Sequence, residues 1–351
     1  MCSAPMPLAN SGTAMSMIRR TFLAVIAAST GLGLVPISIS LAVAQPAPLK
    51  VIVFPTISNL PLFAAQHKRF LAKYNVAIEI INTPNSDELR NGLAEGRYQI
   101  AHAAVDNAVA QIENQKVEAI IVIGGDGGLN QLFVQPEINA IEDIKGKTVA
   151  VDAPNTAYGL LLYKMLKVKG LERGKDYQIK AVGGTGQRLE AMTKDKSLVA
   201  AMLNPPFSIQ AQRAGVVKSF GSPLALTGPY QAGGAWVLKS WANANADLLV
   251  RYLSANIEGA RWALDPANKT EVVKLLSERQ KLAPDVAEAS YALGMDEAGG
   301  GFVKDLAFNM EGFKTVLSLR AEMEGQWSGT PPPPDKYLDL SYYQKALAAL
   351  K

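Results

Sequence analysis

The chain has 351 residues, of which 48% are hydrophobic and 19% are charged, so it is long enough for two domains with apolar cores. The 35 lysines and arginines are scattered among 31 acidic residues, and without a basic stripe we do not expect nucleic-acid binding. One cysteine and two histidines exclude a disulfide framework and a thiolate- or histidine-rich metal site, so we expect neither a metal nor a cofactor.

The first part of the chain has the order of a secretory signal peptide. Arg19 and Arg20 precede an uncharged stretch over residues 21–44, which ends in the small-x-small sequence Ala42-Val43-Ala44. We therefore predict a signal peptide over residues 1–44, cleaved after Ala44, and a product that is free in the periplasm or secreted. An uncleaved membrane anchor is the alternative, and the paired arginines fit twin-arginine export as well as an ordinary signal.

The rest of the chain alternates β-branched runs with helical periodicity, which predicts βαβ units and mainly parallel sheets flanked by helices. The strands are expected at residues 49–54, 76–81, 98–103, 119–123, 131–134, 148–151, 178–182, 198–203 and 235–238. The helices are expected at residues 62–74, 87–93, 106–115, 141–144, 156–169, 187–193, 246–264, 269–280, 284–293, 313–323 and 342–350.

An ordered set of segments carries a resemblance to a known family. The segments are residues 49–59, 103–108, 141–150 (IEDIKGKTVA), 188–192 (RLEAM) and 204–207 (NPPF). Together they resemble the periplasmic solute-binding proteins of ABC importers that take up sulfonates, nitrate, taurine and thiamine precursors. The resemblance implies an α/β fold of two lobes, the type II periplasmic-binding-protein fold, with the ligand in the cleft. Lobe one would comprise residues 49–128 plus 240–351, and lobe two residues 129–239.

Candidate ligand-binding residues follow from the strand ends, because ligands of open parallel sheets sit beyond the carboxyl ends of the strands, near helix N-termini. Tyr230 and Trp236 flank the predicted return to lobe one and could stack on a planar ligand. The full prediction comprises Ser58, Asn59, Asp106, Asn107, Asn155, Thr156, Thr185, Tyr230 and Trp236.

Several of these residues also have a purely structural interpretation. Asp106 and Asn155 could be helix N-caps, and Tyr230 and Trp236 could pack in the core. Arg188 could grip an anion, but an exposed helical charge is the simpler interpretation. His102, inside an apolar strand, fits a hydrogen-bonded core histidine.

Nucleotide and enzyme motifs are incomplete. The sequence from Gly184 to Gly186 opens a helix, but Leu189 stands where a dinucleotide fingerprint has its third glycine. No Gly-x-Ser-x-Gly nucleophile elbow occurs. The related thiamine-pyrimidine synthases use a cysteine-rich iron motif that this chain lacks. We therefore expect a binding protein and not an enzyme, although a periplasmic lyase or hydrolase using Asp106 and His102 is a formal alternative.

The resemblance implies the substrate-binding component of an ABC importer, a monomer that closes its lobes on a small solute and delivers it to an ABC permease in the inner membrane. Hydroxyls, amides and helix N-termini favour an organic sulfonate or carboxylate as ligand. A neutral or amine-bearing heteroaromatic, such as a pyrimidine thiamine precursor, is the alternative, which Asp106 and Asp126 would suit. A periplasmic ligand sensor on the same fold is the alternative of another class.

Overall fold

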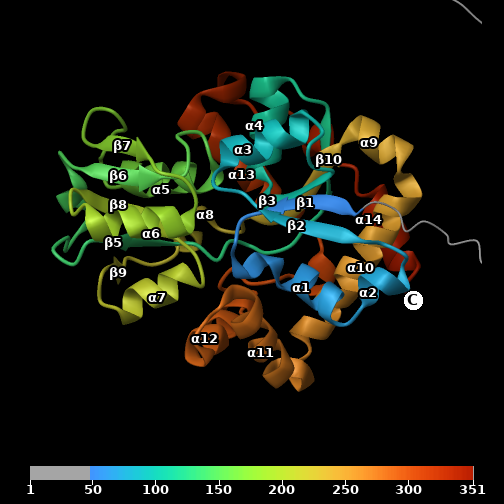
Figure 1. Cartoon of the computed structure of the whole chain (residues 1–351). Coiled ribbons are helices and arrows are strands. Elements are labelled where there is room, and N and C mark those ends of the chain that lie inside the picture. The colour runs from blue at the N-terminus through green and yellow to red at the C-terminus, as the bar shows by residue number, and fades with distance from the viewer. Residues whose placement is uncertain (1–47, 351) are drawn as a thin grey trace, which may run out of the picture. The chain divides into compact units, whose positions relative to one another are not determined.

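Two five-stranded sheets form the framework of the protein (Figure 1). The computed structural model describes residues 48–350, so the predicted signal peptide lies outside the described residues. The described residues belong to one compact unit. The strands are β1 (Leu49–Val53), β2 (Ile78–Asn82), β3 (Ile100–Ala104), β4 (Ala119–Ile123), β5 (Gln131–Val134), β6 (Thr148–Val151), β7 (Gln178–Ala181), β8 (Leu198–Leu203), β9 (Lys218–Ser219) and β10 (Gly233–Leu238).

Both sheets are mixed, with one strand reversed in each. The first sheet has the order β2-β1-β3-β10-β4, and β10 runs antiparallel to both of its neighbours. The second has the order β7-β6-β8-β5-β9, and β5 is the reversed strand. The parallel strands β1, β2 and β3, like β6, β7 and β8, place their carboxyl ends at one edge of each sheet.

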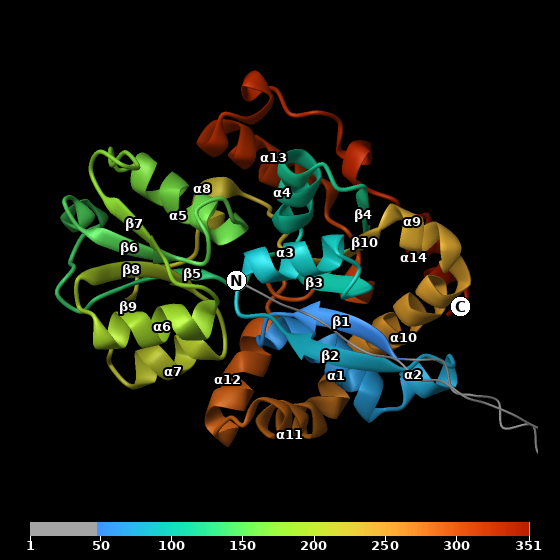
Figure 2. The same cartoon turned by 45° about the horizontal axis from the view of Figure 1, so that its top comes forward.

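Helices cover both faces of each sheet (Figure 2). The residues of β5 and β8 are divided between two apolar clusters, one shared with α5 and the other with α6 and α7. The helices are α1 (Leu60–His67), α2 (Phe70–Lys73), α3 (Ser86–Ala94), α4 (Asp106–Gln115), α5 (Ala157–Lys167), α6 (Thr185–Lys194), α7 (Phe207–Arg213), α8 (Leu224–Thr227), α9 (Lys239–Ala244), α10 (Ala246–Leu264), α11 (Lys269–Gln280), α12 (Pro284–Met295), α13 (Met310–Glu324) and α14 (Ser341–Ala348).

The helix boundaries have local causes. The side chain of Asn85 accepts a hydrogen bond from the Glu88 backbone N–H (2.8 Å) and so caps α3. At the other end of a helix, Gly325 adopts the left-handed conformation that ends α13. The single helix expected over residues 62–74 is split, because Arg69 lies in the left-handed region (φ 59°) between α1 and α2. The helix α7 was not predicted, since the two prolines of the NPPF segment indicate the end of a strand and not the start of a helix.

The position of β10 corrects the predicted lobe boundary. We expected residues 129–239 to belong to lobe two, but β10 is hydrogen-bonded between β3 and β4 in the first sheet. The chain therefore returns to the first sheet before Gly233. The sequence does not show which sheet β10 joins. Its residues are buried on both faces, and a central strand of either sheet would have the same apolar pattern.

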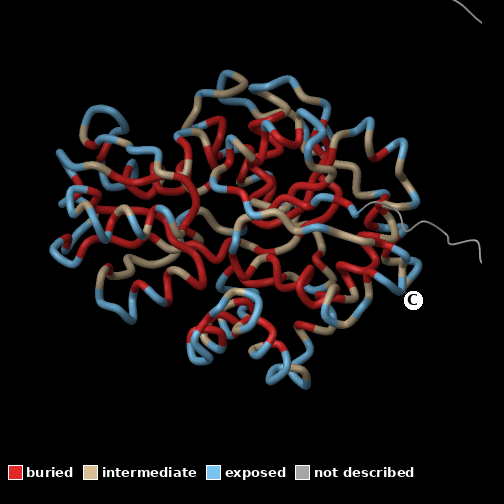
Figure 3. The backbone as a smooth tube through the Cα atoms, viewed as in Figure 1, coloured by how far each residue is buried: buried red, intermediate tan, exposed pale blue. Residues whose placement is uncertain are grey.

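Buried segments run through both sheets and the helices packed on them (Figure 3). The strands β4 and β8 are buried along their whole length, which explains their continuous apolar sequences. One apolar cluster includes residues of both sheets together with α5 and α13. Within residues 48–350, no helix has both the length and the apolar character to span a membrane. In the same range, no group of three or more His, Cys, Asp or Glu side chains is placed to hold a metal ion.

Candidate functional site

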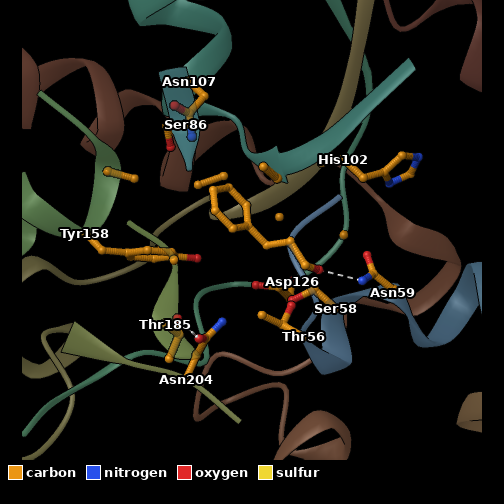
Figure 4. A pocket seen from close by; sticks show the side chains of 18 of the residues that line it. Thr56, Ser58, Asn59, Ser86, His102, Asn107, Asp126, Tyr158, Thr185 and Asn204 are labelled. Carbon is orange, nitrogen blue, oxygen red and sulfur yellow. Dashed lines mark hydrogen bonds between the residues drawn. The ribbon is translucent and has the colours of Figure 1, made fainter. Parts of the chain in front are cut away.

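A cavity lies between the two sheets, at the carboxyl ends of their parallel strands (Figure 4). Its volume is about 70 Å³, so it suits a compact solute. Its polar wall is built from residues of both sheets and of the helices that follow them. These residues are Thr56, Ser58, Asn59, Ser86, His102, Asn107, Asp126, Asp152, Thr156, Tyr158, Thr185, Arg188, Asn204 and Asn256.

The turn after β1 supplies one polar wall. Residues 57–59 form a single 3-10 turn that leads into α1, which places Thr56, Ser58 and Asn59 beside the cavity. The Asn59 side chain donates to the carbonyl oxygen of Phe54 (2.6 Å, dashed in Figure 4), which holds the turn in place. Proline at the second position of α1, Pro61, favours starting the helix there.

The strand ends of the second sheet supply the opposite wall. Asn204 directly follows β8, and its side chain accepts a hydrogen bond from the Thr185 hydroxyl at the start of α6. Arg188, one turn into α6, is 3% exposed and donates to the backbone carbonyl oxygens of Gly183 (2.7 Å) and Met202 (2.9 Å). These bonds tie the start of α6 to the end of β8, so the wall is rigid.

Three polar contacts connect the two walls next to the cavity. The backbone N–H of Ser86, at the start of α3, donates to both carboxylate oxygens of Asp152 (3.2 and 3.3 Å). The Gly184 N–H donates to the Pro84 carbonyl oxygen (2.9 Å). Nearby, Arg90 donates to the Asn155 side chain (3.3 Å). The cleft is therefore narrowed by contacts that join residues of the first sheet's helices to loops of the second.

Burial shifts the protonation of the ionisable groups in the wall. Burial raises the pKa of Asp126 to about 6, although the neighbouring Ser58 hydroxyl and the backbone N–H groups of Gly128 and Gly233 lower it in part. Burial also raises the pKa of Asp152, against the opposing charge of Arg188. The pKa of His102 falls to about 3 by desolvation, so its ring is neutral and its Nε2 lies 2.7 Å from the Tyr252 hydroxyl.

Part of the predicted set of ligand-binding residues is brought together by this cavity. Its wall includes Ser58, Asn59, Asn107, Thr156 and Thr185. They come from both sheets, as expected for residues at strand ends. Their contact with a ligand stays a prediction.

Asp106 and Asn155 do not line the cavity. Asp106 is the first residue of α4, 1% exposed, and its carboxylate accepts two hydrogen bonds from Arg320 Nη1 (2.8 and 2.9 Å). A charged partner 214 residues away in the chain gives no local signal for this pair. The side chain of Asn155 accepts from Arg90, while its carbonyl oxygen accepts from Arg320. Neither residue is the N-cap of its helix, which is Val105 for α4 and Thr156 for α5.

Tyr230 and Trp236 are buried in the core and are not among the residues that line the cavity. Trp236 lies on the central strand β10, is fully buried, and donates its indole N–H to Gln111 (2.9 Å). Tyr230 is 3% exposed and packs where α13 approaches closely: a side chain at Gly312 would come within 2.6 Å of the Tyr230 backbone.

Other wall residues were missed or misjudged from the sequence. Arg188 was expected to be an exposed helical charge, but its guanidinium is buried against carbonyl oxygens. Asp152 and Asn204 are each the first residue after a strand, a signal that the rule on strand ends could have used. Tyr158, in the first turn of α5, could not be predicted as a wall residue, because its position in the helix is one that any apolar residue could occupy. His102, expected to be hydrogen-bonded in the core, is bonded to Tyr252 and also lines the cavity.

Two α/β lobes with a polar cavity between them define the class of two-lobed periplasmic-binding-protein folds. The chain belongs to the NMT1-like family, whose model matches residues 42–277. Its structure is similar to that of the periplasmic nitrate-binding protein NrtA from Synechocystis PCC 6803, with 17% sequence identity, a TM-score of 0.73, and coverage of 87% of this chain and 89% of that one. It is also similar to the alkanesulfonate-binding protein SsuA from Xanthomonas axonopodis pv. citri, with 16% identity, a TM-score of 0.66, and coverage of 84% and 97%. These likenesses confirm the predicted fold class.

Among curated proteins, the chain is 21% identical over 254 residues to the bicarbonate transport ATP-binding protein CmpC of Synechococcus elongatus. The match covers 67% of this chain and 38% of that protein. The chain therefore spans less than half the length of the curated relatives it matches.

Proposed function

We propose that this protein is the solute-binding component of an ABC importer and not an enzyme. The observation that carries the proposal is the cavity between the sheets, whose polar wall comes from both lobes. A solute held by both walls stabilises the closed arrangement, because its contacts with either lobe alone are fewer. The family membership and the similarity to a nitrate-binding and an alkanesulfonate-binding protein support the same function.

The lobes of this mechanism follow the two sheets. Lobe one comprises residues 49–125 together with the return from Gly233 to the end of the chain, and lobe two comprises the second sheet with α5, α6 and α7. Contacts such as Ser86 to Asp152 and Pro84 to Gly184 form when the cleft closes. Their breakage opens the cavity to solvent and admits the solute.

Location and partners complete the proposal. The chain is exported to the periplasm and its signal peptide is cleaved after Ala44; the product acts as a monomer and presents its closed form to a permease in the inner membrane. The similarity to the periplasmic nitrate-binding protein NrtA supports this location.

Two measurements on the purified protein test the function. A bound solute at a hundred times its dissociation constant adds about 2.7 kcal/mol to the free energy of unfolding, which raises the melting temperature by several degrees. A fractionated small-molecule extract therefore identifies a stabilising fraction, and small-angle scattering with that fraction shows a smaller radius of gyration. An unchanged radius together with chemical conversion of the solute would replace the importer function with an enzymatic one.

A further inference from the structure

The charges of the cavity wall are not balanced. The acidic side chains in it are Asp126 and Asp152, the one arginine is Arg188, and His102 is neutral. With both carboxylates ionised, the wall therefore carries one negative charge more than positive charge. The hydrogen bonds and ion pairs that each charged group already makes within the protein decide which of them is available to a ligand.

Arg188 is not available for an anion. Its Nε and Nη2 donate to the Met202 carbonyl oxygen (3.1 and 2.9 Å), its Nη1 to Gly183 (2.7 Å), and its Nη2 also to Thr185 Oγ1 (3.1 Å). A ligand anion would have to displace backbone acceptors that themselves need a donor once buried. The positive charge of Arg188 acts instead on Asp152, whose pKa it lowers against the effect of burial.

At the start of α3, the position where an external anion would bind is already occupied from within the chain. The Asp152 carboxylate accepts a hydrogen bond from the Ser86 N–H there. The Gly184 N–H, just before α6, is likewise used, because the Gln187 side chain accepts from it (2.6 Å).

Asp126 is different, because it has no cationic partner. It is 2% exposed, lines the cavity, and forms no ion pair within residues 48–350. Its Oδ1 accepts the Gly128 backbone N–H (3.1 Å), and the neighbouring Ser58 hydroxyl (Figure 4) and the Gly233 backbone N–H also donate to the carboxylate. A carboxylate has about four acceptor positions, so these neutral donors leave a position for a donor from a ligand and do not neutralise the charge. A buried charge without a partner is costly, and a donor supplied by a ligand removes that cost.

Neighbouring residues keep the carboxylate in place and add a second acceptor. A side chain at Gly233 would come within 2.3 Å of Asp126 Oδ2, so only glycine leaves the carboxylate this position. On the lobe-one side of the cavity, the Asn256 side chain is 2% exposed, and its Oδ1 has no hydrogen-bond partner. The wall thus presents acceptors that need hydrogen-bond donors.

We propose that the cavity selects a compact solute that carries an amine or amidine group, that Asp126 accepts its N–H, and that small anions are rejected. This ligand class rests on the proposed solute-binding function. It differs from the nitrate and alkanesulfonate that the structurally similar proteins bind, and from the anion that helix N-termini alone favour.

Probe molecules of matched shape test the ligand class. Acetamidine and acetate have the same size and planar shape but opposite charge, and both fit the compact cavity. Calorimetric titration of the purified protein at pH 7.5 and constant ionic strength is run with this pair, and also with 4-aminopyrimidine, nitrate and methanesulfonate. We expect binding of acetamidine or 4-aminopyrimidine and none of the three anions.

The variant Asp126→Asn tests the residue. It keeps the side-chain shape, and we expect the amine or amidine probe to bind on the order of 10- to 100-fold more weakly, as for loss of one hydrogen bond to a charged group. The control is Asp247→Asn, whose carboxylate is 88% exposed on α10, with an expected affinity equal to that of the unchanged protein. Circular dichroism verifies that both variants are folded.

Any other outcome overturns the proposed ligand class, and the outcomes differ in what they say about the solute-binding function. Binding of acetate, nitrate or methanesulfonate overturns it and leaves the solute-binding function intact, as does an amine probe that binds the Asp126→Asn variant equally well. If none of the probes binds, the ligand class is also overturned. The solute-binding function is then decided separately by the extract and scattering measurements.

Discussion

Asp126 shows how one buried side chain couples the site to stability. Its pKa is about 6 in the folded protein, against 3.8 for an unperturbed aspartate. Between these values the folded state holds a proton that the unfolded state has lost, so this group makes the free energy of unfolding fall as the pH rises from about 4 to 6. The gap corresponds to about 3 kcal/mol.

The amide of Asp126→Asn has no charge to bury, so this variant's free energy of unfolding does not fall in this way. We therefore expect the free energy of unfolding of the variant, relative to that of the unchanged protein, to rise by up to about 3 kcal/mol from pH 4 to pH 7. Urea denaturation of both proteins at several pH values measures the difference. His102 changes the free energy of unfolding with pH in the opposite sense, but it is present in both proteins, so its contribution cancels in the difference. A stability difference that is the same at pH 4 and pH 7 contradicts the assigned burial. The exposed Asp247→Asn variant controls for the change in net charge.

At the scale of the element, α13 carries two kinds of ion pair. Arg320 is fully buried and bonded to Asp106, whereas Glu322 contacts Lys164 and Lys167 of α5 at the surface. Removing one partner of a buried pair leaves a charge without compensation, but a surface pair is screened by water.

We expect Arg320→Met to lower the free energy of unfolding by about 3 to 5 kcal/mol, and Glu322→Gln on the same helix by about 1 kcal/mol or less. Urea denaturation measures both. Replacing both buried partners, as Arg320→Met with Asp106→Leu, should recover most of the loss, since no charge then remains in the core. Equal losses for the two single variants would contradict the difference in burial.

At the scale of the whole molecule, the bond from Ser86 to Asp152 joins the two lobes. A carboxylate at a helix N-terminus contributes about 0.3 to 2 kcal/mol, so Asp152→Asn should shift the lobes toward the open arrangement. We expect a larger radius of gyration for the ligand-free variant in small-angle scattering. The variant Asp195→Asn, with its carboxylate at the surface of lobe two, is the control. A radius unchanged by Asp152→Asn would mean that other contacts hold the cleft closed.

Much of the fold and part of the site follow from local patterns. Apolar runs such as residues 119–123 and 198–203 predict buried strands, because only a strand covered on both faces tolerates continuous apolar sequence. The rule on strand ends finds Ser58 and Thr185, since polar residues that follow a buried strand lie at the sheet edge where ligands bind. These predictions need only the residues next to them in the chain.

The amino-acid sequence by itself therefore determined the α/β class, the order of most elements and the polar strand ends. Tertiary structure decided the sheet to which β10 belongs, the pairing of Asp106 with Arg320, and the burial of Arg188. It also decided that Asp126 and Asp152, and not Asp106, are the aspartates that line the cavity. The physical reason is distance along the chain: whether a charge is exposed, paired or left for a ligand depends on groups that only folding brings beside it.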